Sequence, residues 1–237
     1  MQDQRAESAY SWGLVVLVTF AISAISLGLM TLMERALSTN GEELRRTWNF
    51  DSESVGGLPN GFVVGTLFDG RPAGDWKIMT VKEAPSPPHV FSQQMNTGAE
   101  HAYKTVLVEG TEASDLDLQV SFLAIGGKGD MGGGLIWRVQ DDRNYYLARA
   151  NPLEQNIRAY RVVKGVRHQL ASVDQIVPIH QWHTLRVMAQ GKQFQVYYDA
   201  RPVLSAKDST FSTGRIGLWT KSDAVTYFDD LQLIRLN

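Results

Sequence analysis

A strict alternation of apolar and polar residues constrains the fold of this chain more than any other feature. It is clearest at residues 116–122, which read LDLQVSF, and it recurs at 184–187 and 194–198. Successive side chains of a β-strand point to opposite faces, so this period predicts strands with one buried face and one wet face. Residues 190–192 (QGK) separate the last two runs and are predicted to form a hairpin turn.

Further strand patterns follow from residue 76 onward, whereas the glycine-rich stretch 49–75 is expected to be irregular. No amphipathic helical pattern of ten or more residues follows residue 47, and turn-forming residues separate most of the runs. Many short strands divided by turns are typical of an all-β sandwich or barrel. The remaining strands are predicted at 76–81, 90–94, 105–109, 134–140, 145–150, 157–163, 168–172, 215–220 and 226–235.

A long apolar run precedes this body. Residues 14–33 are twenty consecutive residues without a charge, and as an α-helix they would extend ~30 Å, the thickness of a bilayer core. Tyr10 and Trp12 stand just before the run, where interfacial aromatic residues are common. We therefore expect a retained transmembrane helix over 14–36. The alternative is a cleaved signal peptide with its cleavage site at 36–38 (ALS), but the run is longer than the usual apolar segment of such a peptide.

The expected organisation has four parts. They are an N-terminal tail at 1–13, a transmembrane anchor at 14–36, a linker at 37–47 and a β-sandwich at 48–237. Small residues at Ala21, Ala24 and Gly28 would let another membrane helix approach the anchor closely. The bilayer and other membrane protein subunits are therefore the expected partners of the N-terminal part.

Composition removes several functional classes. The formal net charge is −2, and this absence of a basic excess disfavours nucleic acid as a partner. The chain has no cysteine, which excludes disulfides, thiolate metal ligands and a cysteine nucleophile.

Four stretches of the body resemble one protein family. They are residues 132–165 (GGGLIWRVQDDRNYYLARANPLEQNIRAYRVVKG), 182–185 (WHTL), 214–220 (GRIGLWT) and 227–231 (YFDDL). Together they resemble bacterial members of the concanavalin A-like lectin/glucanase (laminin G-like) superfamily, nearest to its 3-keto-disaccharide hydrolase domain branch. The resemblance implies a jelly-roll β-sandwich. It leaves the activity open, because lectins, glycosidases and adhesion modules share this fold.

The resemblance also implies a domain outside the cytoplasm, in the periplasm. Charge alone favours the opposite orientation, since Arg35, Arg45 and Arg46 follow the apolar run and only Arg5 precedes it. That rule is weak when a long domain follows a single span. We expect a single-pass protein with an extracytoplasmic C-terminal domain.

Aromatic rings beside arginines form the predicted ligand surface. Sugars stack on aromatic faces while polar side chains bind their hydroxyls, and the resemblance implies the concave face of the larger sheet as the place where they do so. The predicted ligand-binding residues are Trp137, Arg138, Tyr145, Tyr146, Arg149 and Arg158. Alternation places Trp137 and Val139 on one face and Arg138 on the other. The alternative puts the rings in the core and pairs the arginines with Glu154, Asp141 or Asp142.

Two candidate metal sites are present. Asp141 and Asp142 begin the segment DDRN. Its oxygen atoms would suit calcium, which is the cofactor this segment suggests. The alternative is a turn capped by its own Asp and Asn side chains. His180 and His183 would point to opposite faces of a strand, so a shared zinc ion is disfavoured.

No catalytic residue is predicted. The nearest carboxylate pair, Asp115 and Asp117, shares a strand face with Gln119 and Ser121, which indicates an ordinary solvated face. A Gly-x-Ser-x-Gly nucleophile motif is absent from the sequence. We expect a non-catalytic interaction module, an accessory subunit of a larger membrane complex. A lectin-like carbohydrate-binding module and a glycoside or keto-sugar hydrolase are the alternatives.

Overall fold

The computed structural model describes residues 45–236, which consist of strands, turns and loops. These residues belong to one compact unit. Within residues 45–236, no helix is long and apolar enough to cross a membrane. The predicted anchor at 14–36, with Ala21, Ala24 and Gly28, lies outside the described residues.

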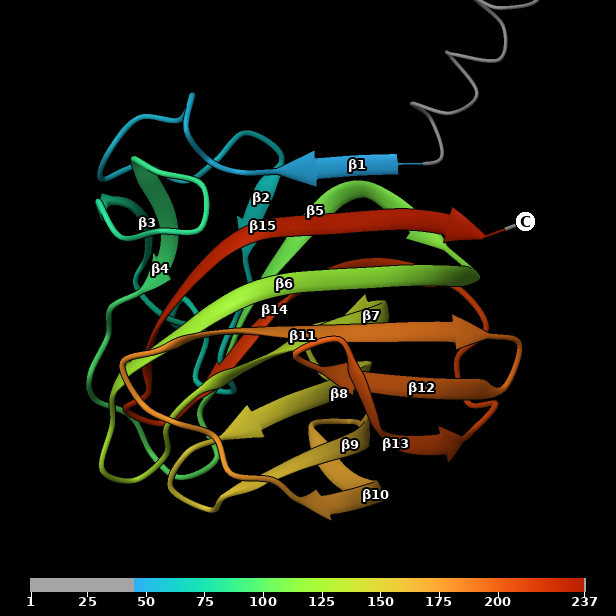
Figure 1. The fold of residues 1–237 in the computed structure, drawn as a ribbon. Helices are drawn as coiled ribbons and strands as arrows, with labels where there is room; N and C mark the ends of the chain where they lie inside the picture. Colours follow the sequence, from blue (N-terminus) through green and yellow to red (C-terminus); the bar gives the residue numbers. More distant parts are fainter. Residues whose placement is uncertain (1–44, 237) are drawn as a thin grey trace, which may run out of the picture. The chain divides into compact units, whose positions relative to one another are not determined.

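Two antiparallel sheets face each other (Figure 1). The first contains β1 (Arg45–Trp48), β3 (Trp76–Thr80), β4 (His89–Gln93), β6 (Asp115–Gly126), β11 (Trp182–Gln190), β12 (Gln193–Tyr198), β13 (Arg201–Lys207) and β15 (Val225–Leu236). Its order is β13-β12-β11-β6-β15-β4-β3, with β1 paired to β15. The second contains β2 (Phe62–Val64), β5 (Tyr103–Ala113), β7 (Gly133–Asp141), β8 (Asn144–Asn151), β9 (Asn156–Val163), β10 (Val166–Asp174) and β14 (Gly214–Lys221), in the order β10-β9-β8-β7-β14-β5-β2.

This architecture confirms the all-β sandwich and the hairpin between β11 and β12. Two features differ from the prediction. The sandwich begins at Arg45, because β1 pairs with the last strand, β15, so the final residues of the predicted linker belong to it. The glycine-rich stretch 49–75 also contains a short strand, β2, paired to β5.

The main core lies between the sheets and follows from the alternation. Leu116, Leu118 and Val120 of β6 are fully buried there, against residues of the seven-stranded sheet such as Leu135 and Trp137. Full burial of each such side chain stabilises the fold by roughly 1.5–3 kcal/mol. Apolar contact between the two inner faces therefore holds the sheets together.

The seven-stranded sheet carries a second apolar cluster on its outer face, the face turned away from the eight-stranded sheet. Its members are Leu107, Ile136, Val139, Tyr145, Leu147, Tyr160, Val162 and Trp219. All of them belong to β5, β7, β8, β9 and β14. One sheet thus buries apolar residues on both faces, which requires its outer face to be covered or strongly bent.

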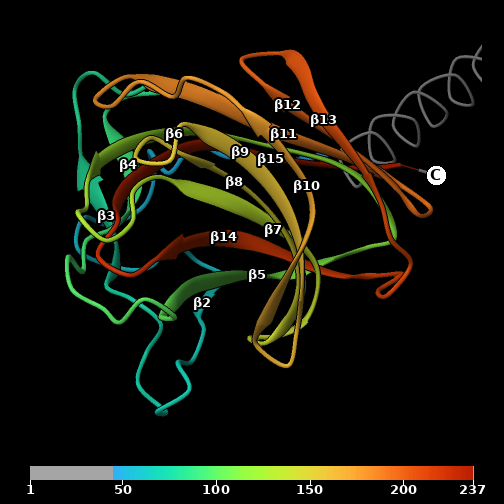
Figure 2. The same ribbon diagram turned by 90° about the horizontal axis from the view of Figure 1, so that it is seen from below.

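The bend is visible in Figure 2, where β7 to β10 arch and their hairpin ends curl away from the eight-stranded sheet. The contacts of Arg167 on β10 show how strong the bend is. Its guanidinium lies 5.9 Å from the ring centroid of Trp219 on β14, four strands away in the sheet order. In a flat sheet four strand spacings would be ~19 Å. The outer face of this sheet is therefore deeply concave, and we call it the concave face. It belongs to the smaller of the two sheets, whereas the resemblance implied the larger one.

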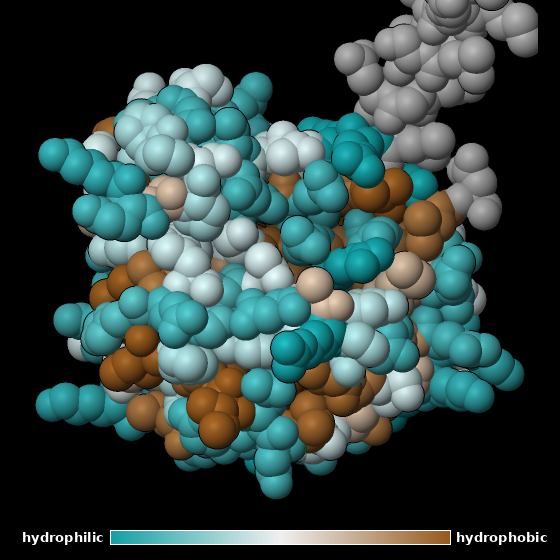
Figure 3. Space-filling view, viewed as in Figure 1, coloured by the Kyte–Doolittle hydropathy of each residue, from teal (hydrophilic) through white to brown (hydrophobic). Residues whose placement is uncertain are grey.

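The outer face of the eight-stranded sheet has a different character. Arg186 lies on it and forms an ion pair with Asp117, while its guanidinium covers the ring of Tyr197 at 4.8 Å. In the space-filling view of Figure 3 the surface is mainly hydrophilic, with separate apolar patches. Its paired charges indicate an ordinary solvated sheet face.

Candidate functional site

The concave face carries a network of charged side chains centred on Arg149. This residue sits in β8 and is only 2% exposed. It donates to Asn156 Oδ1 at 2.8 Å and to Glu154 Oε2 at 2.9 Å. The same carboxylate oxygen accepts from Arg158 at 2.7 Å. The β8–β9 turn, which contains Glu154, thus neutralises two arginines that are adjacent on neighbouring strands.

A buried ion pair continues this network toward the end of the sheet. Lys221, at the end of β14, contacts Asp130 at 3.1 Å, and both side chains are at least nine-tenths buried. Asn151 also donates to Asp130, at 3.1 Å. Burial raises the pKa of Asp130, and Lys221 opposes that effect. A charged pair at this depth stays in place only because each partner has a polar neighbour.

The loop that presents Asp130 is fixed by a second carboxylate. The backbone N–H groups of Lys128, Gly129 and Asp130 all donate to Asp223. Burial acts to raise the pKa of Asp223, but these three N–H groups outweigh it and hold the pKa at about 2. The loop 127–132 is therefore anchored, and Asp130 is held in position over Lys221.

Arg167 lies in the edge strand β10, and its guanidinium reaches over the concave face. Its guanidinium lies 4.9 Å from the ring centroid of Tyr160 and 5.1 Å from that of Tyr103, in addition to Trp219. Tyr160 also borders Arg149, at 6.0 Å. Cation–π contacts of this kind favour flat stacking of the guanidinium on the rings. Rings and guanidinium groups form one surface next to the charged network.

A pocket of about 270 Å³ lies between the loops 67–71 and 95–104. Its lining includes Leu67, Phe68 and Met95, and Lys104 borders it. The Lys104 side chain is fully buried and donates to the carbonyl of Met95. Burial lowers the pKa of this amine to about 8. Phe68 also covers Arg143 at 4.5 Å, so this pocket adjoins the hairpin ends that rim the concave face.

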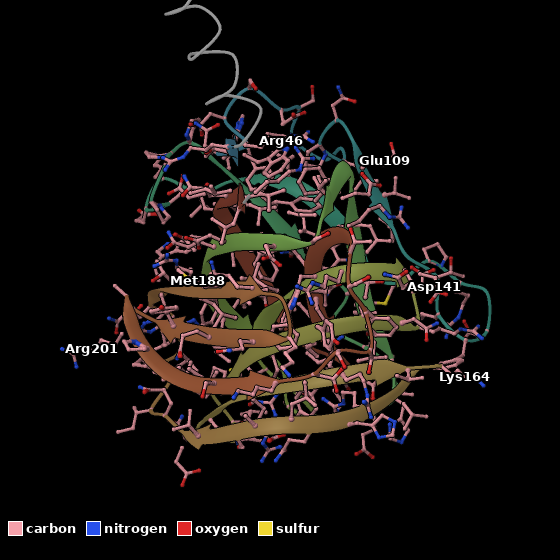
Figure 4. The ribbon with its side chains drawn as sticks, turned by 90° about the vertical axis from the view of Figure 1, so that its right-hand side faces the viewer. Arg46, Glu109, Asp141, Lys164, Met188 and Arg201 are labelled. Carbon is pink, nitrogen blue, oxygen red and sulfur yellow. The ribbon has the colours of Figure 1, made fainter. Side chains whose placement is uncertain are left out.

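Figure 4 shows this rim from the side. Asp141 and Lys164, near the turns β7–β8 and β9–β10, lie next to each other, and Arg201 of β13 lies on the opposite side of the domain. The Cβ of any residue at position 165 would collide with the Phe68 ring, so Gly165 permits the loop 65–72 to pack against the β9–β10 turn. The rim is thus assembled from three chain segments that are far apart in the sequence.

The six predicted ligand residues separate into three groups. Arg149 and Arg158 meet at the concave face through Glu154. Tyr145 also points to that face, together with Leu147, but its ring is fully buried. Trp137 and Tyr146 stack on each other in the main core, with ring centroids 5.5 Å apart.

Arg138 lies elsewhere. Its guanidinium is 2% exposed and donates to the carbonyls of Ser114 and Phe211, with Asp115 at 3.3 Å. The expectation that Trp137 and Val139 share a face is wrong, because Trp137 is in the main core and Val139 is in the outer cluster. The cause is a bulge: Arg138 has φ of 48°, and the β7–β8 register shifts after Trp137.

The two aspartates considered for calcium serve different neighbours. Asp141 accepts from the Arg143 N–H at 2.8 Å and from the Asn144 amide, which is the capped turn given as the alternative. Asp142 accepts from the Thr66 N–H at 2.9 Å. The two carboxylates therefore do not converge on one point. Within residues 45–236, no group of three or more His, Cys, Asp or Glu residues is placed to hold a metal ion.

The other carboxylates and histidines considered from the sequence have local partners. Asp117 pairs with Arg186, and Asp115 accepts from the Gly191 N–H as well as from Arg138. His183 is buried and bonds to Asp199 at 2.8 Å, while His180 is exposed. The pairings of Asp115, Asp117 and His183 are therefore structural, and no side-chain partner of His180 is found within residues 45–236.

The sequence did not indicate Asp130, Lys221 or Arg167 as site residues. Asp130 lies in a glycine-rich loop, and Lys221 and Arg167 are single charges in strands of ordinary composition. Their meeting depends on the sheet order and on the bend. One feature of the sequence did point to this site. Arg149 and Arg158 lie opposite each other on β8 and β9, and two adjacent arginines require a carboxylate nearby.

A family model, the 3-keto-alpha-glucoside-1,2-lyase-like domain, matches residues 64–234. The chain belongs to this family. The match covers every strand of the sandwich except β1 and most of β2. The family membership agrees with the resemblance to the 3-keto-disaccharide hydrolase branch, and it extends over the whole concave face.

Two comparisons show proteins to which this family member is similar. It is 27% identical over 128 residues to a levanase from Bacillus subtilis (strain 168), a match that covers 53% of this chain and 18% of the levanase. The chain thus spans less than a fifth of that relative. Its fold is similar to that of the carbohydrate binding module CBM66 from Bacillus subtilis, with a TM-score of 0.60, 22% identity, and coverage of 73% of this chain and 95% of the module.

A third comparison shows the same fold inside a larger protein. The GH43 BlXynB protein from Bacillus licheniformis matches with a TM-score of 0.56 and 14% identity, over 80% of this chain and 39% of that one. At these identities the structural similarities concern the fold alone. The domain has the β-sandwich fold found in carbohydrate-binding and glycoside hydrolase proteins.

Proposed function

We propose that the domain is a lectin-like module that binds carbohydrate at its concave face, and that residues 14–33 hold it at a membrane. The observation that carries the proposal is the placement of Arg149, Glu154 and Arg158 beside Tyr160 and Arg167 on one concave surface. Sugars need flat surfaces for their C–H faces and fixed donors and acceptors for their hydroxyls. This face supplies both.

Similarity to known proteins also supports carbohydrate binding. CBM66 is by name a carbohydrate binding module, and the chain covers almost its whole length. The levanase match extends over 18% of that enzyme, which is the share of an ancillary domain rather than of a complete catalytic protein. Each is consistent with recognition of a sugar by this sandwich.

The carboxylates of the concave face are paired with cations, which fits binding without cleavage. Glycosidases need two carboxyl groups free to face each other across the scissile bond. On the concave face Asp130 is paired with Lys221, and Glu154 is shared by Arg149 and Arg158. Both acids are thus committed to stabilising cations in the described domain.

Cleavage is the second candidate, because the family is named for a lyase. Asp130 is the residue that favours it: the carboxyl is buried beside Lys221, and burial raises its pKa, as is common for proton-transfer groups. Conversion of Asp130 to Asn would then abolish turnover while preserving binding. Under the binding proposal there is no turnover to lose.

The membrane role rests on the sequence of residues 14–33 and on the small residues at Ala21, Ala24 and Gly28. A tether there would present the sandwich at the outer surface of the membrane, as an accessory subunit beside other membrane proteins. Extraction in mild detergent followed by native mass analysis tests this part. A fixed ratio with other membrane proteins supports it, and recovery as a lone monomer contradicts it.

The binding proposal is tested by screening the purified full chain on a glycan array, together with an assay for release of reducing or unsaturated sugars. The expected result is binding to at least one glycan class with no release. Turnover of a bound glycan would select the lyase or hydrolase alternative. Absence of binding to every glycan would reject the proposal.

A further inference from the structure

We propose that the concave face selects an acidic sugar, and that Arg167 is the residue that binds its carboxylate. The inference rests on the proposed carbohydrate binding and adds the chemical class of the ligand. It starts from a difference among the arginines of this face. Arg149 and Arg158 are both neutralised by Glu154, whereas the guanidinium of Arg167 has no ion pair and no hydrogen bond with any residue of 45–236.

Arg167 is nevertheless held in place. Its partners are the rings of Tyr160, Tyr103 and Trp219, at 4.9, 5.1 and 5.9 Å. Contacts to ring faces use the plane of a guanidinium and leave its N–H edges available. The side chain is half-buried, so those edges reach the surface. Its position is therefore fixed before any ligand arrives, which lowers the entropic cost of binding.

The neighbouring carboxylates do not satisfy this charge. Glu154 is used by Arg149 and Arg158, and Asp130 is used by Lys221. The charges of Asp142 and Arg167 both act on Tyr145. The Asp142 carboxylate, however, accepts the N–H of Thr66. An uncompensated guanidinium that is stacked on rings in a concavity matches the planar, two-oxygen geometry of a carboxylate.

Tyr160 connects this charge to the rest of the face. Its ring lies between Arg167, at 4.9 Å, and Arg149, whose Nη2 is 3.4 Å from the Tyr160 hydroxyl. A uronic acid residue that places its carboxylate on Arg167 would lie next to Tyr160 and reach the Glu154 network with its hydroxyls. A neutral sugar would offer Arg167 only hydroxyl oxygens as acceptors and no negative charge. Selection for a uronate follows from that difference.

The test uses tetragalacturonate and its methyl ester, which differ in the charge of each carboxyl group and by one methyl group per sugar, as titrants of the purified full chain. We expect the acid to bind about tenfold or more tightly than the ester, because charge-assisted hydrogen bonds are roughly twice as strong as neutral ones. The Arg167→Gln variant should lose that preference, and Arg167→Lys should recover part of it. Arg201→Gln is the matched control, because Arg201 is exposed on the opposite side of the domain (Figure 4).

The outcomes separate this inference from the proposed function. Equal affinity for acid and ester, or an acid preference that survives in Arg167→Gln, overturns the assignment of Arg167 while glycan binding stands. Binding of neutral glycans alone on the array has the same meaning. Failure to bind any glycan rejects the proposed function itself. A melting temperature measured for each variant shows that Arg167→Gln is folded.

Discussion

Arg149 and Arg158 lie directly opposite each other on β8 and β9 and share one oxygen of the Glu154 carboxylate, at 2.9 and 2.7 Å. Like charges in this position destabilise a sheet unless an anion lies between them. Glu154 therefore has a structural role that precedes any role in binding. It makes a doubly cationic surface compatible with the fold.

Replacement of Glu154 by Gln should destabilise the domain by about 1–2 kcal/mol, because it removes the anion and leaves Arg149 buried and unpaired. Glu83→Gln, at an exposed position, is the control. Urea unfolding at pH 7 measures both variants. Equal stability of the two would show that solvent alone compensates the arginines.

The ion pairs of Glu154 with Arg149 and Arg158 also predict that this contribution to stability is lost at acidic pH. Burial acts against the charge of Glu154, but Arg149 and Arg158 outweigh it and keep the pKa of this carboxyl below its usual value. Because the folded-state pKa is lowered, the contribution is present above the unfolded value near 4.5 and is lost as the pH falls through the folded value. The stability difference between wild type and Glu154→Gln should therefore shrink below pH 4.5.

Asp229, in the eight-stranded sheet, predicts the opposite dependence of stability on pH. It is fully buried in β15, where burial raises its pKa to about 7, although it accepts the N–H groups of Ser86 and Asp230. A raised pKa means that its stabilising contribution is complete below the unfolded value near 3.8 and is lost as the pH rises through about 7.

Asp229→Asn should therefore stabilise the domain at pH 8, by about 2 kcal/mol and at most ~4 kcal/mol for a shift of this size, and should give no gain at pH 4. The amide oxygen can still accept one of the two N–H groups. Asp174→Asn, at an exposed aspartate, is the control. Thermal unfolding between pH 4 and 8 measures the difference, and a gain that does not vary with pH would contradict the assignment.

The buried pair of Asp130 and Lys221 predicts strong coupling. Either Asp130→Asn or Lys221→Met alone leaves an unpaired buried charge and should cost about 3 kcal/mol. The double variant should lose clearly less than the sum of the two single losses. Chemical unfolding of the four proteins gives the coupling energy. Additive losses would mean that the pair is hydrated and contributes little.

Tyr146 predicts a smaller loss in the main core. Its hydroxyl donates to Asp208 at 2.6 Å and accepts the Phe211 N–H at 3.1 Å, which fixes the β13–β14 connection against β8. Tyr146→Phe should cost about 1–2 kcal/mol, because one of these bonds goes to a charged group. Tyr227→Phe, at a half-buried tyrosine of β15, is the control. An equal effect of both changes would show that the loss is not due to the Asp208 bond.

The sequence was sufficient for the fold because the alternation in strands such as β6 reports one buried face directly. It failed at Arg138, where a bulge with φ of 48° puts Trp137 and Val139 on opposite faces of the sheet. A bulge adds one residue to a strand and leaves no mark on composition. The predicted aromatic platform at Trp137 and Tyr146 is therefore part of the core.

The candidate site was only partly predictable for a related reason. Arg149 and Arg158 could be inferred from their neighbouring strands, but Arg167 reaches Trp219 across four strand positions because the sheet bends. The degree of bending depends on the packing of both sheets and on the loops that rim the concave face. Local sequence patterns carry no information about it, so residues brought together by curvature are found only in the structure.

The claim that the concave face binds carbohydrate is tested most directly by comparing two matched variants on a glycan that the full chain binds. Arg158→Gln alters the concave face, and Arg186→Gln alters the outer face of the other sheet; the two side chains are 31% and 30% exposed, and each is paired with one carboxylate. We predict that Arg158→Gln weakens glycan affinity by about tenfold and that Arg186→Gln leaves it unchanged. Unchanged affinity in Arg158→Gln together with loss in Arg186→Gln would place the ligand on the opposite sheet and contradict the account.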